Sequence, residues 1–322
     1  MTSICIYPPL KGLGGPASFF ARLSAGLRER GYVVHSNPSD PSTSAILQIG
    51  GTKRLDLLWR ARRRGVRIVQ RLNGMNWIHR KTRTGLKHYI RSEYSNWLLA
   101  VVRRRLAHAV IYQSQFARSW WQTVYGNISV PTHVVYNGVD VKTYTPQGPG
   151  TPPADHFRLL LVEGHLKGGH ETGLDNAIHL ARALRDDPAG RWELMVAGEV
   201  PPEIQSRYQN EDLWITLRGV VRREDVAEMD RSAHVLFSAD LNAACPNAVI
   251  EALACGLPVV SFATGSLPEL LQDGAGIVVP YGSNYWNLEP PVLEPLAAAA
   301  QQLVAGKEIS RRAARARAEA MF

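Results

Sequence analysis

The chain has 322 residues, of which 45% are hydrophobic, and it carries 37 Lys and Arg against 28 Asp and Glu, a formal net charge of +9. This length allows a sizeable core, most simply in two domains of about 150 residues, and the three cysteines lack the number and spacing of a disulfide framework or a zinc site. No apolar run approaches the ~18 residues of a spanning helix, and the opening "MTSICIYPPLKG" lacks a signal-peptide pattern, so we expect a cytoplasmic protein.

The first half of the chain alternates β-rich runs with helical stretches. The runs are "SICIYP", "YVVHS", "SAILQIG", "VRIVQRL", "AVIYQS" and "HVVYNG", and helices are predicted over Pro16 to Arg30 and Leu86 to His108. Alternation of this kind is typical of a doubly wound α/β domain, a parallel sheet with helices on both faces.

The glycines after the first run let the backbone approach a ligand closely. They lie in "KGLGGPASFF", where Gly14 and Gly15 precede Pro16, a residue suited to open a helix. The third glycine of the dinucleotide fingerprint is missing, and no acid follows about 20 residues on. The loop alone is therefore a weak indication of a nucleotide site.

The stretch "RLNGMNWIHRKTRTG" follows the fourth predicted strand, so we expect its side chains at the ligand-binding edge of the sheet. Arg71, Asn73, Trp77 and His79 offer a cation, hydrogen bonds and a flat apolar surface that suits a sugar ring. A packed core tryptophan and a surface histidine are the structural alternative. We interpret these four residues as candidates for binding a sugar-like acceptor substrate.

The first half is also strongly basic. Up to Gly150 it has 22 Lys and Arg against 5 Asp and Glu, while the remainder is net negative. This asymmetry indicates an anionic partner, which could be a phosphorylated substrate, an anionic membrane surface or nucleic acid. A solvated basic face that only aids solubility is the alternative.

The alternating pattern breaks at "TPQGPGTPPAD", which has four prolines and two glycines and predicts a linker and hinge. It restarts with "FRLLLVEG", a helix over Thr172 to Arg185, and the runs "WELMVAGEV", "LWITLRG", "HVLFSA", "LPVVSFA" and "AGIVVP". We therefore predict a first domain over 1–145, a second over 156–305, and a basic helix over 306–322 that crosses back to the first domain. Two such domains would face each other across a cleft.

The second half places one acidic residue inside the apolar stretch "AVIEALACG". Glu251 lies four residues after Asn247 on the same helical face, and a buried carboxylate is costly unless a partner hydrogen-bonds to it. Pro246 should start this helix, whose first amides near Asn247 and Ala248 would attract an anion. A nucleotide diphosphate whose ribose meets Glu251 fits both features, whereas an internal salt bridge or a carboxylate facing water is the alternative.

Three motifs together resemble the family 4 retaining glycosyltransferases, which have the GT-B fold of two Rossmann-like domains. They are "VVYNGVD", "VAGEV" and "CPNAVIEALACGLPVV", and the resemblance extends from Gly14 to about Glu269. It implies that Glu251 binds the donor ribose and that backbone near Val220 meets the base. The other donor-binding positions that it implies are Gly14, Gly15, Gly164, Lys167, Asn242, Ala243, Ala244, Cys245, Asn247 and Ala248.

The chain departs from the family pattern at three places. Ala243 stands where the family has the first glutamate of its E-x7-E motif, and His165 replaces an arginine before Lys167. Asn73-Gly74 stands where the family has His-Gly. Sugar contacts at Ala243 would pass to Asn242 or to backbone amides, and Lys167, His165 and Glu251 are the catalytic candidates that the resemblance implies.

The expected reaction is transfer of a sugar from a UDP- or GDP-linked donor to a hydroxyl of a glycan, a glycolipid or a phosphorylated small molecule. No Asp-x-Asp pair occurs in the sequence, so we expect no metal and no cofactor, with cations and helix amides stabilising the leaving diphosphate. The resemblance implies retention of anomeric configuration. An anionic or lipid-linked acceptor would bring the enzyme to the inner face of a membrane.

Two other functions stay open on the sequence. A sugar-nucleotide epimerase can share this architecture, and a nucleic-acid-binding protein would explain the basic half. The absence of a recognisable nucleic-acid-binding motif makes nucleic acid the less favoured partner.

Overall fold

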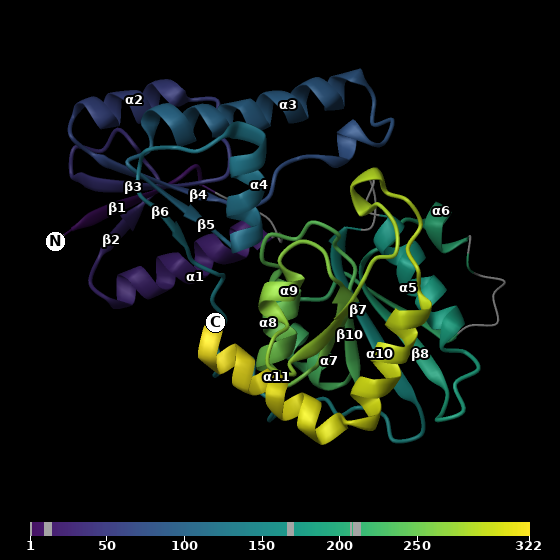
Figure 1. Ribbon diagram of the computed structural model, residues 1–322. Helices are drawn as coiled ribbons and strands as arrows, with labels where there is room; N and C mark the ends of the chain where they lie inside the picture. The colour runs from purple at the N-terminus through teal and green to yellow at the C-terminus, as the bar shows by residue number, and fades with distance from the viewer. Residues whose placement is uncertain (1, 10–14, 166–170, 207, 209–213) are drawn as a thin grey trace. The chain divides into compact units, whose positions relative to one another are not determined.

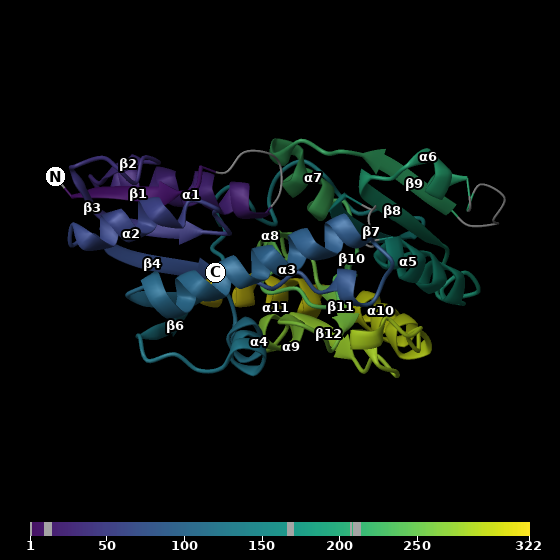
Figure 2. The same cartoon turned by 90° about the horizontal axis from the view of Figure 1, so that it is seen from above.

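A computed structural model describes residues 2–9, 15–165, 171–206, 208 and 214–322 of the chain. It divides into two compact units, Met1–Tyr136 and Asn137–Phe322. Each unit is built on a six-stranded, wholly parallel sheet, with helices on both faces (Figures 1 and 2). The predicted α/β class with two doubly wound sheets is confirmed.

The first unit contains the six predicted strands in the order β2-β1-β3-β4-β5-β6. They are β1 (Ser3–Tyr7), β2 (Val33–His35), β3 (Thr43–Ile49), β4 (Arg67–Leu72), β5 (Ala109–Tyr112) and β6 (Thr132–Val134). Its helices are α1 (Gly15–Glu29), α2 (Leu55–Arg63), α3 (Leu86–Val101) and α4 (Gln115–Tyr125), with a 3-10 turn at Ile78–Arg80 and a π-helical turn at Val102–Leu106. Buried apolar residues such as Ile46, Leu58 and Ile68 join the sheet to α2.

The second unit has the strand order β12-β11-β10-β7-β8-β9. Its strands are β7 (Phe157–His165), β8 (Trp192–Glu199), β9 (Trp214–Gly219), β10 (Val235–Ser238), β11 (Val259–Phe262) and β12 (Gly276–Val279). The helices are α5 (Glu171–Ala183), α6 (Pro202–Gln205), α7 (Val226–Arg231), α8 (Asn247–Ala254), α9 (Leu267–Leu270), α10 (Glu294–Ala305) and α11 (Lys307–Met321), with 3-10 turns at Arg223–Asp225 and Tyr285–Asn287. Because β10 returns to the other side of β7, the chain direction across the sheet reverses between these two strands.

The boundary between the two units lies before the predicted linker. It falls between Tyr136 and Asn137, so the predicted linker Thr145 to Asp155 lies inside the second unit. Arg231 of α7 donates to the carbonyls of Thr145 and Pro149 at 3.1 and 2.5 Å. Gly150 has φ +92°, and any Cβ there would collide with the carbonyl of Glu228. The absence of a side chain at Gly150 therefore permits close packing on α7, and a hinge in this segment stays a prediction.

The C-terminal helix α11 belongs to the second unit and packs on α8. Arg315 donates to the carbonyls of Val141, Tyr144 and Ala254 at 2.7 to 3.1 Å, and the carbonyl of Phe322 accepts a bond from the Val139 amide at 3.1 Å. The helix thus does reach residues that the sequence interpretation placed in the first domain. Those residues belong instead to the second unit.

Candidate functional site

The reversal of the second sheet brings two loops together. One begins at the carboxyl end of β7, whose last residues are Glu163–His165, and the other runs from Ala239 to Cys245 between β10 and α8. Ligands of doubly wound sheets bind beyond the carboxyl ends of the strands at such a reversal. The predicted donor-binding residues of both loops therefore follow β7 and β10, the two strands that border the reversal.

Helix α8 begins where the sequence predicts. Pro246 has extended backbone angles, φ −72° and ψ 126°, and Asn247 is the first helical residue. The first N–H groups of any helix lack acceptors within that helix and carry its positive dipole end. Because Asn247 and Ala248 are partly exposed, their amides are suited to hold an anion.

The side chain of Glu251 lies one turn into α8 and is buried, with 9% of the residue exposed. It acts on a second carboxyl group, that of Asp230 on α7. Burial, and then the negative charge of Glu251, raise the pKa of Asp230 well above its usual range, and Arg231 only partly offsets this. The two carboxyl groups are therefore electrostatically coupled, and the charge of Glu251 disfavours ionisation of Asp230.

Asn137, from the "VVYNGVD" motif, holds the loop that leads into α8. Its side-chain amide donates to the carbonyl of Cys245 at 2.8 Å and to the side-chain oxygen of Asn247 at 2.9 Å. Its backbone N–H lies 3.3 Å from the sulfur of Cys245. Asn137 therefore fixes the residues before the helix and the first residue of the helix itself.

The loop that contains Gly265 and Ser266 packs against the backbone of Ala243. The N–H of Ser266 donates to the carbonyl of Ala243 at 2.9 Å. Gly265 has φ +56°, and a Cβ there would lie 2.8 Å from the backbone nitrogen and oxygen of Ala243. This close approach requires a glycine and holds the backbone at the position where the family has its glutamate.

The amide side chain of Asn242 is buried, and both its polar atoms lack a hydrogen-bond partner among the described residues. Its backbone N–H donates to Asp240 at 3.2 Å. Since water cannot reach these side-chain atoms, a sugar could contact them only after the loop moves. The backbone amides of this loop are more direct candidates for the sugar contacts than the Asn242 side chain.

Glu163 and Asp240 form a carboxyl pair at the reversal that the sequence interpretation did not single out. Burial, and then the charge of Asp240, raise the pKa of Glu163 to about 8. Each residue stands at or just beyond the carboxyl end of its strand, which is the signal that could have identified the pair.

The structure describes some of the other predicted donor-binding residues fully, some by their backbone alone, and two not at all. Gly164 is exposed with open space beside its Cα, and Val220, just after β9, is 56% exposed. His165 is the last residue of β7 and Gly15 is the first residue of α1, and only their backbone positions are described. Gly14 and Lys167 lie outside the described residues, whereas Ala244 is partly exposed and Cys245 is buried.

The four predicted acceptor residues do not form one exposed cluster. Arg71 is buried with its guanidinium 3.5 Å from the centre of the Phe19 ring. His79 is also buried, and its Nε2 lies 2.7 Å from the carboxylate of Glu93 on α3. Asn73 and Trp77 are partly exposed. The alternative of a surface histidine does not hold for His79, because Glu93, fourteen residues further along the chain, binds it inside the unit.

Comparisons with known proteins decide the family. Residues 52–143 match the family described as "Glycosyltransferase Family 4", and residues 158–304 match "Glycosyl transferases group 1". The chain belongs to the group 1, family 4 glycosyltransferases. A putative glycosyltransferase EpsF of Bacillus subtilis is 27% identical over 153 residues, covering 45% of this glycosyltransferase and 39% of EpsF. The chain covers less than two thirds of the length of the curated relatives that it matches.

Solved structures confirm the GT-B fold of this glycosyltransferase. Sucrose-phosphate synthase from Thermosynechococcus elongatus superimposes with a TM-score of 0.74 at 16% identity, over 100% of this chain and 95% of that one. HepE of Anabaena in complex with UDP-glucose gives a TM-score of 0.68 at 16% identity, over 100% and 96% of the two chains. Both likenesses extend over the whole chain and include both units.

Proposed function

We propose that this glycosyltransferase moves a hexose from a nucleoside-diphosphate donor to a hydroxyl acceptor with retention of anomeric configuration and without a metal ion. The observation that carries the proposal is the position of Glu251, four residues after the first amide of α8 and beside the reversal of the second sheet. The diphosphate would lie against the amides of Asn247 and Ala248. The ribose hydroxyls would then donate to Glu251.

Charge development at the leaving diphosphate would be stabilised by the helix amides together with Lys167 and His165. Asn137 and Gly265 hold the surrounding backbone in place, and preorganised donors need no reorganisation when charge develops. The acceptor would attack on the face from which the diphosphate leaves, and the leaving phosphate would take its proton. Binding of UDP-glucose by HepE supports a UDP-linked donor, with GDP as the alternative base.

A membrane-bound, lipid-linked acceptor is supported by the outer face of α3. Leu86, Ile90, Tyr94 and Trp97 are exposed and follow the spacing of one helical face. Lys87 and Arg91 are exposed on the same helix. Exposed apolar side chains beside cations suit the surface of an anionic bilayer. In the described parts of the chain, no helix has both the length and the apolar character needed to cross a membrane.

A thermal-shift panel of UDP, GDP and their hexose conjugates tests the donor site. A ligand at 100 times its Kd adds about 2.7 kcal/mol of stability, so the correct nucleotide should raise the Tm of the wild type clearly. Glu251→Gln should lose that shift, whereas Glu294→Gln, which changes an exposed glutamate on α10, should keep it. An equal shift in both variants would contradict the proposed site.

Transfer and epimerisation are separated by product analysis. The family match favours transfer, which requires an acceptor, while an epimerase would convert the nucleotide sugar alone. NMR of the products should show acceptor-dependent consumption of the donor and the donor's own anomeric configuration in the product. Conversion of the donor without acceptor would favour the epimerase.

Flotation with vesicles tests the acceptor surface. Vesicles rich in phosphatidylglycerol should bind the wild type at low salt. Leu86→Ser with Ile90→Ser should weaken binding by about a hundredfold or more, because each change removes ~1.5–3 kcal/mol of apolar burial. Ile309→Ser on α11, an equally exposed apolar position, is the control. Equal binding by all three proteins would refute docking through α3.

A further inference from the structure

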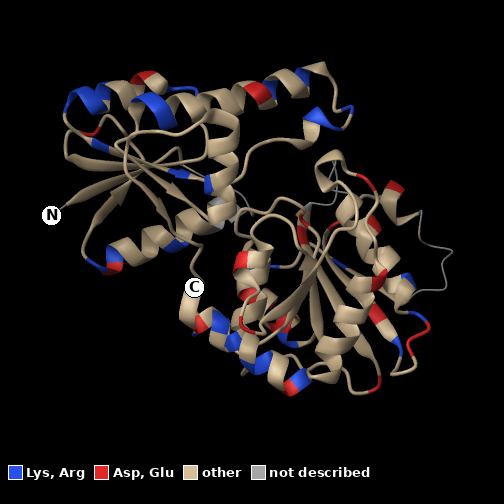
Figure 3. Cartoon of the chain, viewed as in Figure 1, with Lys and Arg blue, Asp and Glu red and all other residues tan. Residues whose placement is uncertain are grey.

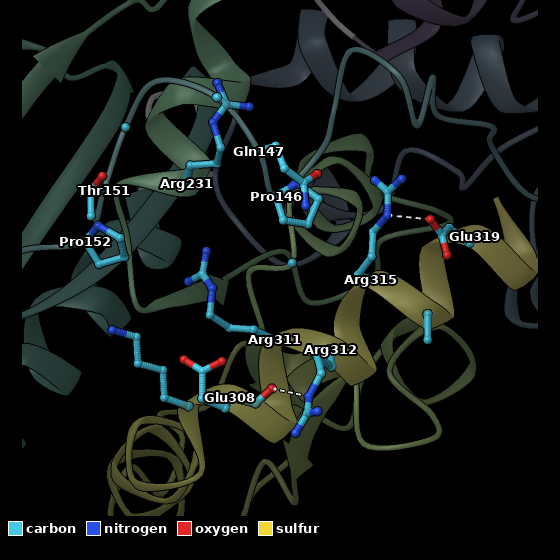
Figure 4. A pocket seen from close by; sticks show the side chains of 15 residues that line it. Pro146, Gln147, Thr151, Pro152, Arg231, Glu308, Arg311, Arg312, Arg315 and Glu319 are labelled. Carbon is cyan, nitrogen blue, oxygen red and sulfur yellow. Dashed lines mark hydrogen bonds and ion pairs between the residues drawn. The ribbon is translucent and has the colours of Figure 1, made fainter.

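A cavity of about 550 Å³ lies in the second unit between the segment 146–152 and α11. Gly256, just beyond the C-terminal end of α8, also lines it. Figure 4 shows this cavity with its lining side chains. Since the donor site occupies the N-terminal end of α8, the cavity lies at the opposite end of the same helix.

The lining is strongly cationic. Five basic side chains and two carboxylates, those of Glu308 and Glu319, line it, which leaves three positive charges in excess. The basic residues are Arg231, Lys307, Arg311, Arg312 and Arg315. Lys307, Arg311 and Arg315 stand four residues apart along α11, so they share one helical face, and Figure 3 shows the run of basic residues on this helix.

Two of these cations are at least partly withdrawn from water and donate to backbone carbonyls. Arg231 is 6% exposed and donates to two backbone carbonyls, and Arg311 is partly buried and donates to the carbonyl of Ala233 at 3.1 Å. Within the described ranges, no carboxylate lies within 4.0 Å of either guanidinium. Burial lowers the pKa of Arg311, and the negative charge of Glu308 offsets this only in part, as expected where a cation is desolvated.

The remaining cations differ in how they are engaged. Arg315 is paired with Glu319 at 2.7 Å and also holds three backbone carbonyls. Arg312 donates to the carbonyl of Glu308 at 3.3 Å, and Lys307 is exposed. Arg311 points toward the centre of the cavity in Figure 4. An anion in the cavity would therefore lie within reach of Arg311, and Lys307 stands one helical turn before it on α11.

We propose that this cavity is a second anion site, which binds a small phosphate-bearing ligand through Arg311 and Lys307, with Arg231 and Arg312 adding to its positive field. The volume suits a ligand larger than a single phosphate, and guanidinium forks match phosphate oxygens. The site does not depend on the proposed function, since none of its lining residues belongs to the donor site. Bound anion would join α11 to the segment 146–152.

Hydrogen–deuterium exchange with inorganic pyrophosphate as the probe tests this site locally. At millimolar pyrophosphate, amides in 145–152 and 307–319 should exchange more slowly in the wild type than in sodium chloride of equal ionic strength. Arg311→Gln combined with Lys307→Gln should lose most of this protection, by about tenfold in apparent affinity. Protection around Asn247 reports the donor site separately.

Two further proteins keep the result interpretable. Arg311→Lys retains the charge and should retain part of the protection, and Arg185→Gln, which changes an exposed arginine of the same unit outside the cavity, should behave as the wild type. Thermal unfolding without anion shows whether each variant folds. Protection by phosphatidic acid vesicles but not by pyrophosphate would identify a lipid headgroup as the source of the phosphate. No protection by either probe, or equal protection in the double variant, would overturn the proposal.

Discussion

The two units present charge and polarity to ligands in different ways. At the reversal of the second sheet, hydrogen bonds from Asn137 and close packing at Gly265 fix the loops in place, and the carboxyl group of Glu251 is buried. In the first unit, by contrast, Arg71 and His79 are buried with partners of their own, and exposed cations and apolar residues lie on α3. Under the proposed function, the donor would meet a preorganised site and the acceptor a broad surface.

Glu251→Ala is expected to have the largest effect. Two lost hydrogen bonds to a charged group, each worth about 1.5–3 kcal/mol, should weaken donor affinity by about a hundredfold or more. Stability should fall little, because removing the charge also relieves Asp230. Calorimetric titration and thermal unfolding of the same variant check both parts. A variant that unfolds far earlier but binds nucleotide normally would show that Glu251 serves the core instead.

Asn137→Ala tests whether the second-unit loop is preorganised. Losing the bonds to Cys245 and Asn247 should lower stability by about 1–3 kcal/mol and donor affinity by about tenfold, since the first turn of α8 becomes less ordered. Asn127→Ala, at an exposed position in the first unit, is the control. If donor affinity is unchanged while stability falls, the hydrogen bonds of Asn137 stabilise the fold but do not organise the donor site.

The strands and helix α8, including its start after Pro246, were predictable from the sequence. The periodicity of hydrophobic residues and the effect of proline on the backbone are local properties of the chain. The domain boundary was not predictable, because prolines 146, 149 and 152 indicate a linker by composition, whereas docking by Arg231 and Arg315 depends on residues far away in the sequence. The partner of His79 and the carboxyl neighbours of Glu163 and Glu251 likewise arise only from tertiary packing.

His79→Ala probes the first unit, where we expect a structural role. The imidazole is bound to Glu93 and packs edge-on against Tyr89 at 5.1 Å between ring centres. Its removal should cost about 1–3 kcal/mol of stability and leave donor affinity unchanged within twofold. Urea unfolding and nucleotide titration provide the two readouts. A loss of donor affinity at full stability would place this residue in the site after all.

The effect of Glu163→Gln on stability depends on pH. Because the pKa in the folded state, about 8, lies above the ordinary value of 4.5, the fold retains a proton that the unfolded chain releases. The contribution of this group to stability is present below about pH 4.5 and is lost as the pH rises through 8. Urea unfolding at pH 5, 7 and 9 should therefore show a smaller decline for Glu163→Gln than for the wild type. Parallel declines would mean that Glu163 is not held neutral.

The most direct test of the donor site is a crystal structure of the wild type grown with UDP or GDP. The account predicts the diphosphate against the N–H groups of Asn247 and Ala248, with both ribose hydroxyls within hydrogen-bond distance of the Glu251 carboxylate. A nucleotide bound elsewhere, or a Glu251 side chain turned into the protein and away from the ribose, would contradict it.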